Sequence, residues 1–519
     1  MSNHVHTKKK WGLKSLCSLL LSKIVIVSLL IILQMAFLLA VILLLGDHFV
    51  WIYSILMLLS IAIVVWLVNK NENPAYKLAW VIPLLSFPLF GGLFYLMFGN
   101  KGMPQKLARR IRAAEKGAHR VCQPGGPLVQ ELESLDSRCA AISNYITRTT
   151  GAPLWNRTSS EYFPLGEDMW QRMLEELAKA EKFIFMEYFI LDEGKMWESI
   201  FRILEEKAAA GVEVRFMYDD MGSIFTLPPN YGEKLRAAGI QCTVFNPYQP
   251  HLNSMMNYRD HRKITVIDGN VGFCGGINIA DEYINAYEKY GHWKDTGVML
   301  KGDGVWNLTA MFLSLWNFSR QADVDPVSFR PTRFWESDGF VQPFGDSPLD
   351  RVNVCEDVYM QIINRATRYV YMTTPYLILD NEMVTALQTA ARSGIDVRIL
   401  VPHLPDKWFV HQTTQSFYQQ LLDTGVRIYE YTPGFVHAKM YVSDDEIAVV
   451  GTANMDYRSF YLHFECAVAF YHARLVADVR EDILRTLEQS FEIPKDYSRH
   501  VKLWKRIVRA FLRLFSPMM

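Results

Sequence analysis

Apolar residues are distributed along this chain in two different ways. The first hundred residues contain two long uncharged stretches, 24–46 and 50–68. Each is close to the roughly 20 helical residues that cross a hydrocarbon core. A third apolar stretch, 78–98, is interrupted by two prolines and a Gly–Gly pair, so it fits either a kinked span or a re-entrant segment. We therefore expect residues 1–100 to form a multi-pass membrane region that places the protein in the cell membrane.

Basic residues indicate how this region is oriented. Lysines before and at the start of the first apolar stretch favour a cytoplasmic N-terminus (Lys8, Lys9, Lys10, Lys14 and Lys23). Two spans would then return the chain to the cytoplasm. A third complete span would place the basic cluster within 101–112 outside, against the same rule. The charges therefore favour a cytoplasmic remainder of the chain, and whether 78–98 crosses completely stays open.

After a basic linker, 101–140, the apolar pattern changes to alternating short strands and amphipathic helices. Residues 183–191 read as a buried strand, 196–210 as a helix that ends before Gly211, and 212–220 as a second strand. Such alternation predicts an α/β fold with a mostly parallel sheet that is covered by helices.

The same pattern then occurs a second time. The matching segments are KFIFMEYFILD (182–192) with RYVYMTTPYLILD (368–380), and GIQCTVF (239–245) with GVRIYEY (425–431). Repetition at this scale indicates duplicated structural units. We expect two tandem, pseudo-symmetric α/β lobes, 141–330 and 331–490, whose approximate twofold relation brings equivalent residues to a shared cleft.

The C-terminal tail, 491–519, has a different character. Between 502 and 515 its large apolar residues lie on one helical face and its basic residues on the other. This arrangement is typical of a helix in the interface of an anionic membrane. The alternative is a helix packed on the protein core. The apolar residues are Leu503, Trp504, Ile507, Val508, Phe511, Leu512 and Phe515; the basic ones are Lys502, Lys505, Arg506, Arg509 and Arg513.

Composition excludes several functional classes. The formal net charge is zero, so no overall field favours a nucleic-acid partner. The seven cysteines include no Cys-x-x-Cys pair, which fits reduced thiols and gives no zinc site or disulfide framework. The chain has no Gly-x4-Gly-Lys-Ser/Thr phosphate loop and no His-Glu-x-x-His motif. We therefore expect neither nucleotide hydrolysis nor a requirement for a metal or cofactor.

One phrase occurs in both lobes, HRKITVIDGNVGFCGGIN from 261 and HAKMYVSDDEIAVVGTAN from 437. Both copies follow the rule His-x-Lys-x4-Asp-x6-Gly-x2-Asn. Identical spacing in two matching lobes makes a chance origin very unlikely. The residues concerned are His261, Lys263, Asp268, Gly275 and Asn278 in the first copy, and His437, Lys439, Asp444, Gly451 and Asn454 in the second.

These residue types suit displacement at a phosphodiester. On a strand that begins at His261, the histidine and lysine share one face. Two lysines and two asparagine amides stabilise the phosphoryl charge, and the two glycines let backbone approach a ligand. One neutral histidine attacks phosphorus, while a protonated one donates to the leaving alkoxide. Asp295 and Glu465 are the candidates that orient the imidazoles. Asp268 and Asp444 either share that task or cap turns.

With these motifs, the chain resembles the phospholipase D superfamily, and within it the bacterial cardiolipin synthases of the phospholipase D type. The resemblance extends from residue 77 to the C-terminus and includes Gly275–Gly276–Ile277–Asn278 and Gly451–Thr452–Ala453–Asn454. It implies transfer of a phosphatidyl group from one phosphatidylglycerol to another, through a phosphatidyl-histidine, without a cofactor. It also implies His261 as nucleophile and His437 as general acid and base; the sequence alone permits the reverse. The additional apolar stretch 24–46 departs from the two spans common in the family.

Other interpretations of the same residues remain. The enzyme could hydrolyse its lipid with water, use another alcohol acceptor, or use a CDP-diacylglycerol donor. A nuclease of the superfamily is disfavoured by the zero net charge and the apolar N-terminus, and an inactive membrane scaffold by the two intact motifs. We expect phosphatidylglycerol and anionic membrane lipids as partners, while the oligomeric state, including a homo-oligomer, stays open.

Overall fold

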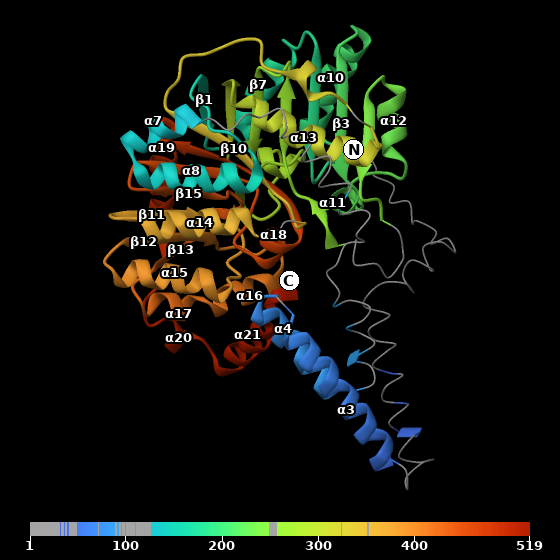
Figure 1. Ribbon diagram of the computed structural model, residues 1–519, viewed down its shortest axis with the longest axis vertical. Helices are drawn as coiled ribbons and strands as arrows, with labels where there is room; N and C mark the ends of the chain where they lie inside the picture. Colours follow the sequence, from blue (N-terminus) through green and yellow to red (C-terminus); the bar gives the residue numbers. More distant parts are fainter. Residues whose placement is uncertain are drawn as a thin grey trace, which may run out of the picture. The chain divides into compact units, whose positions relative to one another are not determined.

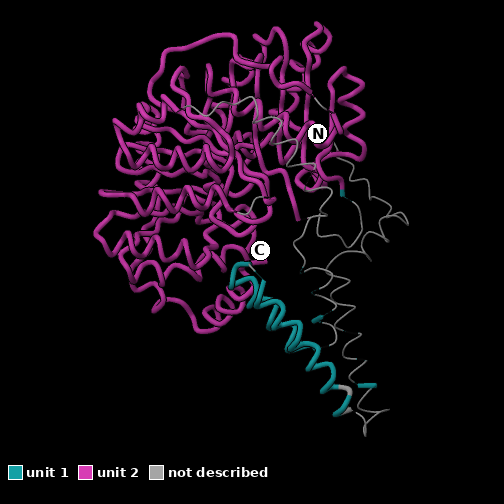
Figure 2. The backbone as a smooth tube through the Cα atoms, in the orientation of Figure 1, with its two compact units in different colours: residues 1–102, 248–255 teal, residues 103–247, 256–519 magenta. Residues whose placement is uncertain are grey.

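The computed structural model describes residues 49–70, 72–88, 126–248, 257–322, 324–349 and 352–518, with isolated positions between 32 and 109. The chain divides into two units, residues 1–102 with 248–255 and residues 103–247 with 256–519 (Figure 2). Apart from isolated positions, the predicted stretch 24–46 and most of the predicted linker lie outside the described residues.

Two helices are described in the smaller unit. Helix α3 (Phe49–Val68) coincides with the predicted stretch 50–68, and α4 (Pro74–Ser86) contains Pro83. The side chain of Asn73 caps α4 by accepting a hydrogen bond from the Ala75 amide at 2.9 Å. On the described residues alone, no helix has both the length and the apolar character needed to cross a membrane. The membrane spans therefore stay a prediction.

The larger unit contains two large sheets, one in each predicted lobe (Figure 1). A third sheet has two strands, β8 (His292–Lys294) and β14 (Gly434–Val436), one from each lobe. The first sheet has the order β1-β9-β7-β6-β2-β3-β4. Its strands are β1 (Thr158–Phe163), β2 (Phe183–Tyr188), β3 (Glu213–Asp219), β4 (Gln241–Phe245), β6 (Ile264–Ile267), β7 (Val271–Gly275) and β9 (Gly297–Gly302). Its helical elements are α9 (Gly166–Leu177), α10 (Lys195–Ala209), α11 (Asp220–Ser223), α12 (Tyr231–Ala237), η3 (Asp281–Ile284), α13 (Val305–Arg320) and η4 (Pro326–Phe329).

The second sheet has the order β10-β17-β16-β15-β11-β12-β13-β18. Its strands are β10 (Phe340–Asp346), β11 (Tyr369–Thr373), β12 (Asp396–Pro402), β13 (Arg427–Tyr431), β15 (Met440–Ser443), β16 (Ile447–Gly451), β17 (His463–Tyr471) and β18 (Ser490–Glu492). The accompanying helices include α7 (Gly126–Leu135) and α8 (Ser137–Thr150), which precede the first sheet in the sequence. Helix α8 packs here, on α14 and β10, and α7 packs on α8. The others are α14 (Val354–Arg365), α15 (Asn381–Arg392), α16 (Trp408–Ser416), α17 (Tyr418–Leu422), α18 (Tyr457–Tyr461), α19 (Leu475–Glu488), α20 (Tyr497–His500), α21 (Leu503–Leu514) and η5 (Ser516–Met518).

The prediction of mostly parallel sheets is wrong. Strands β2, β3 and β4 are parallel, as are β11, β12 and β13, because a helix connects each strand to the next. The motif strands β6 and β7 instead form an antiparallel hairpin that continues the sheet through β9 and β1. A short turn can join only antiparallel neighbours. The strands that are connected without a crossover helix therefore form the antiparallel half of the sheet.

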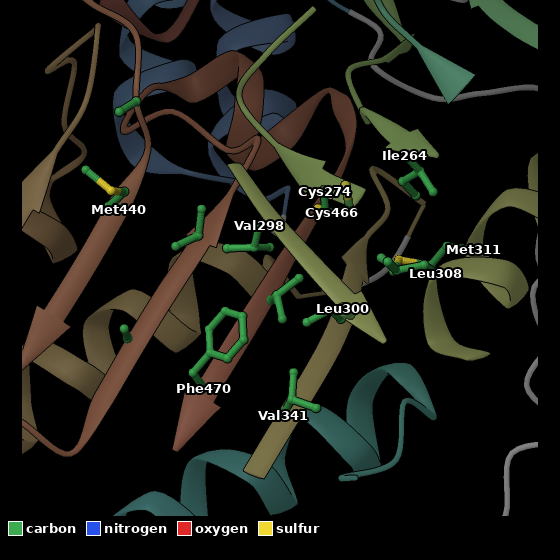
Figure 3. Close-up of a cluster of buried hydrophobic side chains, with 14 of the residues drawn as sticks. Ile264, Cys274, Val298, Leu300, Leu308, Met311, Val341, Met440, Cys466 and Phe470 are labelled. Atoms are coloured by element: carbon green, nitrogen blue, oxygen red, sulfur yellow. Dashed lines mark hydrogen bonds between the residues drawn. The ribbon is translucent and has the colours of Figure 1, made fainter. Parts of the chain in front are cut away.

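Both lobes contribute to one hydrophobic core. Helix α13, buried over most of its circumference, packs on the first sheet and on β10 of the second. Figure 3 shows Val298 and Leu300 of the first lobe beside Val341 and Phe470 of the second. The Sγ atoms of Cys274 and Cys466, both free thiols, lie 3.5 Å apart in this core. Because the apolar surfaces of the lobes cover each other, neither lobe has a core of its own there.

Candidate active site

Short strands from opposite lobes pair beside each motif histidine. Strand β5 (Arg259–Asp260), just before His261, runs parallel to the start of β17 at His463–Phe464. Strand β14 (Gly434–Val436), just before His437, runs parallel to β8 (His292–Lys294). The two pairs are equivalent under the duplication, and each places a motif histidine against the strand that carries a carboxylate of the other lobe.

The motif histidines continue the backbone hydrogen bonding of these two strand pairs. The amide of His261 donates to the carbonyl of Phe464 at 2.9 Å, and the amide of His437 donates to the carbonyl of Lys294 at 2.7 Å. Residues 261–263 lie between β5 and β6, and residues 437–439 lie between β14 and β15. The prediction of a strand that begins at His261 is therefore wrong, because β6 begins only at Ile264. Up to that point the chain pairs with the opposite lobe.

Each imidazole consequently contacts a carboxylate from the opposite lobe. Nδ1 of His261 lies 2.9 Å from Oε2 of Glu465, and Nδ1 of His437 lies 2.6 Å from Oδ2 of Asp295. Both carboxylates are completely buried. A carboxylate at Nδ1 fixes the tautomer that carries its proton there, which leaves Nε2 of each ring available for chemistry. The structure thus brings together the predicted orienting residues and both motif histidines.

Burial holds both imidazoles in the neutral form. His261 is 6% exposed and His437 is 7% exposed. Burial lowers the pKa of His261 to about 3, against the opposing attraction of Glu465. Burial and the neighbouring Lys439 lower the pKa of His437 to about 4, opposed by Asp295. Lys263 lowers both values further, so the two rings respond to the same cation in one shared site.

The two lysines are buried beside the histidines, and each Nζ donates to the backbone carbonyl of its own motif histidine. Lys439 Nζ also contacts the imidazole of His437, at 2.8 Å from Nδ1 and 3.0 Å from Nε2. Burial lowers the pKa of Lys263 to about 8 and that of Lys439 to about 7, which is also lowered by Lys263. An anion bound between these two side chains would raise both pKa values and favour the charged ammonium forms.

The motif aspartates lie at the other end of their strands. Asp268 accepts hydrogen bonds from the amides of Glu181, Lys182 and Phe183 at 2.7–2.8 Å. Asp444 accepts from the amides of Thr367, Arg368 and Tyr369 at 2.7–3.0 Å. These amides begin β2 and β11, the equivalent strands of the two lobes. The contacts favour the structural alternative for the aspartates, a cap that fixes a neighbouring strand.

Comparison with known proteins identifies the family. Residues 173–298 and 359–487 match the domain described as "Cardiolipin synthase, PLD-like domain", and residues 58–100 match "Phospholipase_D-nuclease N-terminal". A cardiolipin synthase of Geobacillus thermodenitrificans is 34% identical over 91% of this chain and 95% of its own length. An uncharacterized protein of Streptococcus mutans is 42% identical over 88% of this chain and 99% of its own length.

The chain belongs to the cardiolipin synthase family of phospholipase D-like proteins. Its fold is also that of a phosphatidylserine synthase from Haemophilus influenzae, with a TM-score of 0.54 and 13% identity. That comparison covers 73% of this chain and 98% of the synthase. The predicted tandem phospholipase D-like α/β architecture is therefore confirmed.

At the glycines of this phospholipase D-like site, other atoms of the protein occupy the space that a side chain would need. A Cβ atom at Gly275 would lie 2.5 Å from the Cα of Gly297, and one at Gly451 would lie 2.5 Å from the Cβ of Ala467. At Gly276 it would lie 2.2 Å from Oδ1 of Asp295, the carboxylate that contacts His437. The predicted substrate-binding role of Gly275 and Gly451 stays a prediction; the contacts show that close strand packing requires both.

The two motif asparagines have different surroundings. Asn278 accepts from the Ile190 amide at 2.9 Å and donates to the Tyr283 hydroxyl at 2.7 Å, so both ends of its amide are used within the first lobe. Asn454 donates to Asp456 at 3.1 Å, while its Oδ1 has no hydrogen-bond partner among the described residues. Substrate binding by these residues stays a prediction, and Asn454 is the better placed of the two.

Sequence reasoning did not single out the residues that make the two halves of the site unequal. His463 lies with its ring 5.3 Å from that of His261 and its Nδ1 3.6 Å from Oε1 of Glu465. At the equivalent place in the other half, Trp293 lies 5.5 Å from the His437 ring. The signal in the sequence was the His-x-Glu spacing, which stands opposite Trp-x-Asp when the two lobes are aligned.

Two groups among the described residues have metal-ligating atoms within 4.8 Å of one another. One is His261 with His463 and Glu465, and the other is Asp136 with Cys139 and His472. In the first, the carboxylate already bonds an imidazole and the Thr452 hydroxyl. In the second, Asp136 caps α8 through the amides of residues 138 and 139. Hydrogen bonding within the chain therefore accounts for both groups.

Proposed function

We propose that this chain is a cardiolipin synthase, which transfers a phosphatidyl group from one phosphatidylglycerol to a second and releases glycerol. The observation that carries the proposal is the pair of crossed contacts, His261 with Glu465 and His437 with Asp295. They occur in a chain that is 34% identical to a cardiolipin synthase over 91% of its length. Two oriented imidazoles beside two cations suit two consecutive displacements at one phosphorus atom.

In the first step, Nε2 of His261 attacks the phosphorus of phosphatidylglycerol. A phosphorus–nitrogen bond forms, the bond from phosphorus to the glycerol oxygen breaks, and His437 gives that oxygen its proton. Positive charge develops on the ring of His261, and Glu465 stabilises it at 2.9 Å from Nδ1. The products are glycerol and a phosphatidyl-histidine, with His437 left neutral.

In the second step, a second phosphatidylglycerol enters with its free headgroup hydroxyl beside His437. The neutral imidazole takes the hydroxyl proton, the oxygen attacks phosphorus, and the phosphorus–nitrogen bond breaks. The product is cardiolipin, and both histidines return to their starting states. One phosphodiester is broken and one is made, so the reaction needs no external energy source.

An asymmetry between the motifs supports His261 as the nucleophile. Among the described residues, no group forms a hydrogen bond with Nε2 of His261. Nε2 of His437 instead has the Lys439 ammonium at 3.0 Å, and the same ammonium lies 2.8 Å from Nδ1 of that ring. A lone pair that receives a hydrogen bond is a weaker nucleophile, whereas a nearby ammonium can return a proton to the ring. An anionic phosphodiester between the two motifs would raise the pKa of His437 and favour its protonated form.

Membrane attachment is part of the proposal. We infer that the N-terminal residues anchor the enzyme in the cell membrane as a multi-pass region, with the lobes on the cytoplasmic side. Supporting this are the family match over residues 58–100 and the exposed large apolar side chains of α3, including Trp51, Ile55 and Leu58. Both phosphatidylglycerol substrates reside in that membrane.

The test is the product balance of the purified enzyme in membranes that contain phosphatidylglycerol, measured by mass spectrometry. We expect cardiolipin and glycerol in equal amounts, and neither product with His261→Ala or His437→Ala. Phosphatidic acid as the main product would mean that water is the acceptor and would overturn the synthase proposal. Turnover that depends on added CDP-diacylglycerol would overturn it in favour of a different donor.

The nucleophile is tested separately by acid quenching with phosphatidylglycerol labelled in its phosphatidyl group. We expect label to remain on the His437→Ala protein and not on the His261→Ala protein. The opposite result would reverse the two roles without affecting the identity of the reaction.

A further inference from the structure

The C-terminal helix α21 packs on the protein through two of its arginines, Arg509 and Arg513. Arg509 is 7% exposed, and its Nε donates to Oε1 of Gln412 on α16 at 3.0 Å. Arg513 donates to the Ser416 carbonyl at 3.3 Å and lies with its guanidinium 4.2 Å from the centre of the Phe417 ring. The helix is therefore packed on the protein, as the alternative prediction had it, and these arginines make the contact.

Four of the apolar residues of α21 point away from these contacts, while Val508, Leu512 and Phe515 are half-buried. Leu503, Trp504, Ile507 and Phe511 are between 54% and 70% exposed. They follow a spacing of one, three and four residues, so they form one stripe along the helix. An exposed apolar stripe beside basic residues is characteristic of a helix that lies in a membrane interface.

Three arginines of α21 also line a cavity of about 300 Å³ between α16, α17, α20 and α21. Arg506, Arg509 and Arg513 contribute to its wall, together with Gln415, Gln419 and Tyr497. The volume is at the lower end of the range of ~300–1,000 Å³ that is typical of ligand pockets. It is sufficient for a polar headgroup, whereas acyl chains would have to lie outside it. No residue of the histidine site lines this cavity.

The cavity carries uncompensated positive charge. Among the described residues, none of these three arginines forms an ion pair with a carboxylate. Arg509 and Arg513 contact only neutral groups, chiefly glutamine amides and a backbone carbonyl. Gln415 separates Arg509 from Glu430, and that carboxylate also binds His403 and Tyr418. Arg509 is buried, and a buried cation is ordinarily paired with an anion because its desolvation is costly.

We propose that this cavity binds the phosphate of an anionic phospholipid headgroup, while the apolar stripe of α21 enters the surface of the same membrane. The two observations support one occupant, because only a membrane lipid offers an anion at the depth of an interfacial helix. The site is a second lipid site, separate from the histidines. It holds the enzyme on membrane that is rich in its anionic substrate.

The test uses the full-length protein in nanodiscs, with His261→Ala as a background so that the lipid is not consumed. Hydrogen–deuterium exchange of residues 497–514 is measured as phosphatidylglycerol replaces phosphatidylcholine. We expect protection that increases with phosphatidylglycerol content. In Arg506→Gln, the content required for half-maximal protection should rise about fivefold, the contribution of one basic side chain at an anionic surface.

Two further variants separate the parts of the proposal. Arg499→Gln removes an exposed charge that does not line the cavity. It should leave the midpoint, which is the phosphatidylglycerol content at half-maximal protection, unchanged. Ile507→Ser alters an exposed side chain and should weaken protection without affecting the fold. Because Arg506 and Ile507 are both exposed, neither variant removes a buried contact.

Three outcomes would overturn the proposal. Protection that is the same in phosphatidylcholine alone would show that headgroup charge has no part. Equal midpoints for Arg506→Gln and Arg499→Gln would show that the cavity is not the site. Protection by inorganic phosphate in phosphatidylcholine nanodiscs, at the level reached with phosphatidylglycerol, would identify a free phosphate site instead of a lipid site.

Discussion

Replacing Glu465 with glutamine tests the crossed arrangement most directly. The amide has the shape of the carboxylate, and its oxygen can still accept the hydrogen bond from Nδ1 of His261, which lies 2.9 Å from Oε2. What is lost is the negative charge opposite a ring that becomes cationic when it attacks phosphorus. The carboxylate is completely buried, so solvent provides little screening of that charge.

The size of the effect follows from the contact. Two unit charges about 4 Å apart interact by about 4 kcal/mol at an effective dielectric constant of about 20. A hydrogen bond to a charged group contributes about 1.5–3 kcal/mol net. Taking about 3 kcal/mol, we expect kcat to fall roughly 150-fold, since each 1.36 kcal/mol corresponds to a factor of ten. KM should stay constant or fall, because the site becomes more positive toward an anionic substrate.

The assay is the initial rate of cardiolipin formation over a range of phosphatidylglycerol contents, with acid-quenched single turnovers that follow the labelled phosphatidyl-enzyme. We expect slower formation of that intermediate. Asp295→Asn should slow both its formation and its decay, since its partner His437 acts in both steps of the proposed reaction.

Glu430→Gln is the matched control. Glu430 is another buried glutamate whose carboxylate contacts a histidine Nδ1, that of His403, at 2.8 Å. It lies outside the motif site, so its substitution should lower stability and leave kcat within a few-fold of the wild type. The reasoning would be refuted if Glu465→Gln retained kcat within threefold of the wild type, or if Glu430→Gln lost as much activity.

Three other predictions follow from the same site. Gly276→Ala should lower kcat at least tenfold, because its Cβ would lie 2.2 Å from Oδ1 of Asp295, whereas Gly126→Ala meets nothing within 4 Å and should have wild-type rates. Asp444→Ala leaves three backbone amides without an acceptor and should destabilise the fold by about 3 kcal/mol in thermal unfolding, while Asp444→Asn should keep near-normal activity per folded molecule. A large loss of kcat in a fully folded Asp444→Asn protein would restore a catalytic role. The free energy of unfolding should decrease by about 2 kcal/mol for His437 alone between pH 6.5 and 5, because its pKa is lowered from 6.5 to about 4 and only the unfolded chain takes up the proton. His437→Gln should remove that part of the pH dependence in denaturant titrations, and an unchanged slope would contradict the low pKa.

Much of the local structure could be predicted from hydrophobic patterning. The predicted strand 212–220 contains β3 (Glu213–Asp219), and the predicted helix 196–210 is α10 (Lys195–Ala209) within one residue at either end. The direction of the motif strands could not be predicted in this way. A buried strand has the same apolar pattern whether its neighbour is parallel or antiparallel, and only the connection to that neighbour distinguishes them.

The C-terminal helix illustrates a different limit. Its two-faced pattern was clear in the sequence, and α21 forms there. The pattern does not state which face contacts the protein. In the structure the arginines do, because α16 and α17 offer the side-chain oxygens of glutamines and one backbone carbonyl oxygen to their guanidinium groups. This is the reverse of the usual rule that an amphipathic helix packs by its apolar face.

The sequence by itself determined the chemical groups of the site: two identically spaced histidine–lysine motifs, a carboxylate downstream of each, and the duplication that makes them equivalent. Only the tertiary structure decided which carboxylate serves which histidine. His261 contacts Glu465 across 204 positions of sequence, and His437 contacts Asp295 across 142. The physical reason is the pairing of β5 with β17 and of β14 with β8, in which backbone hydrogen bonds between lobes fix a register that no pattern within one lobe contains.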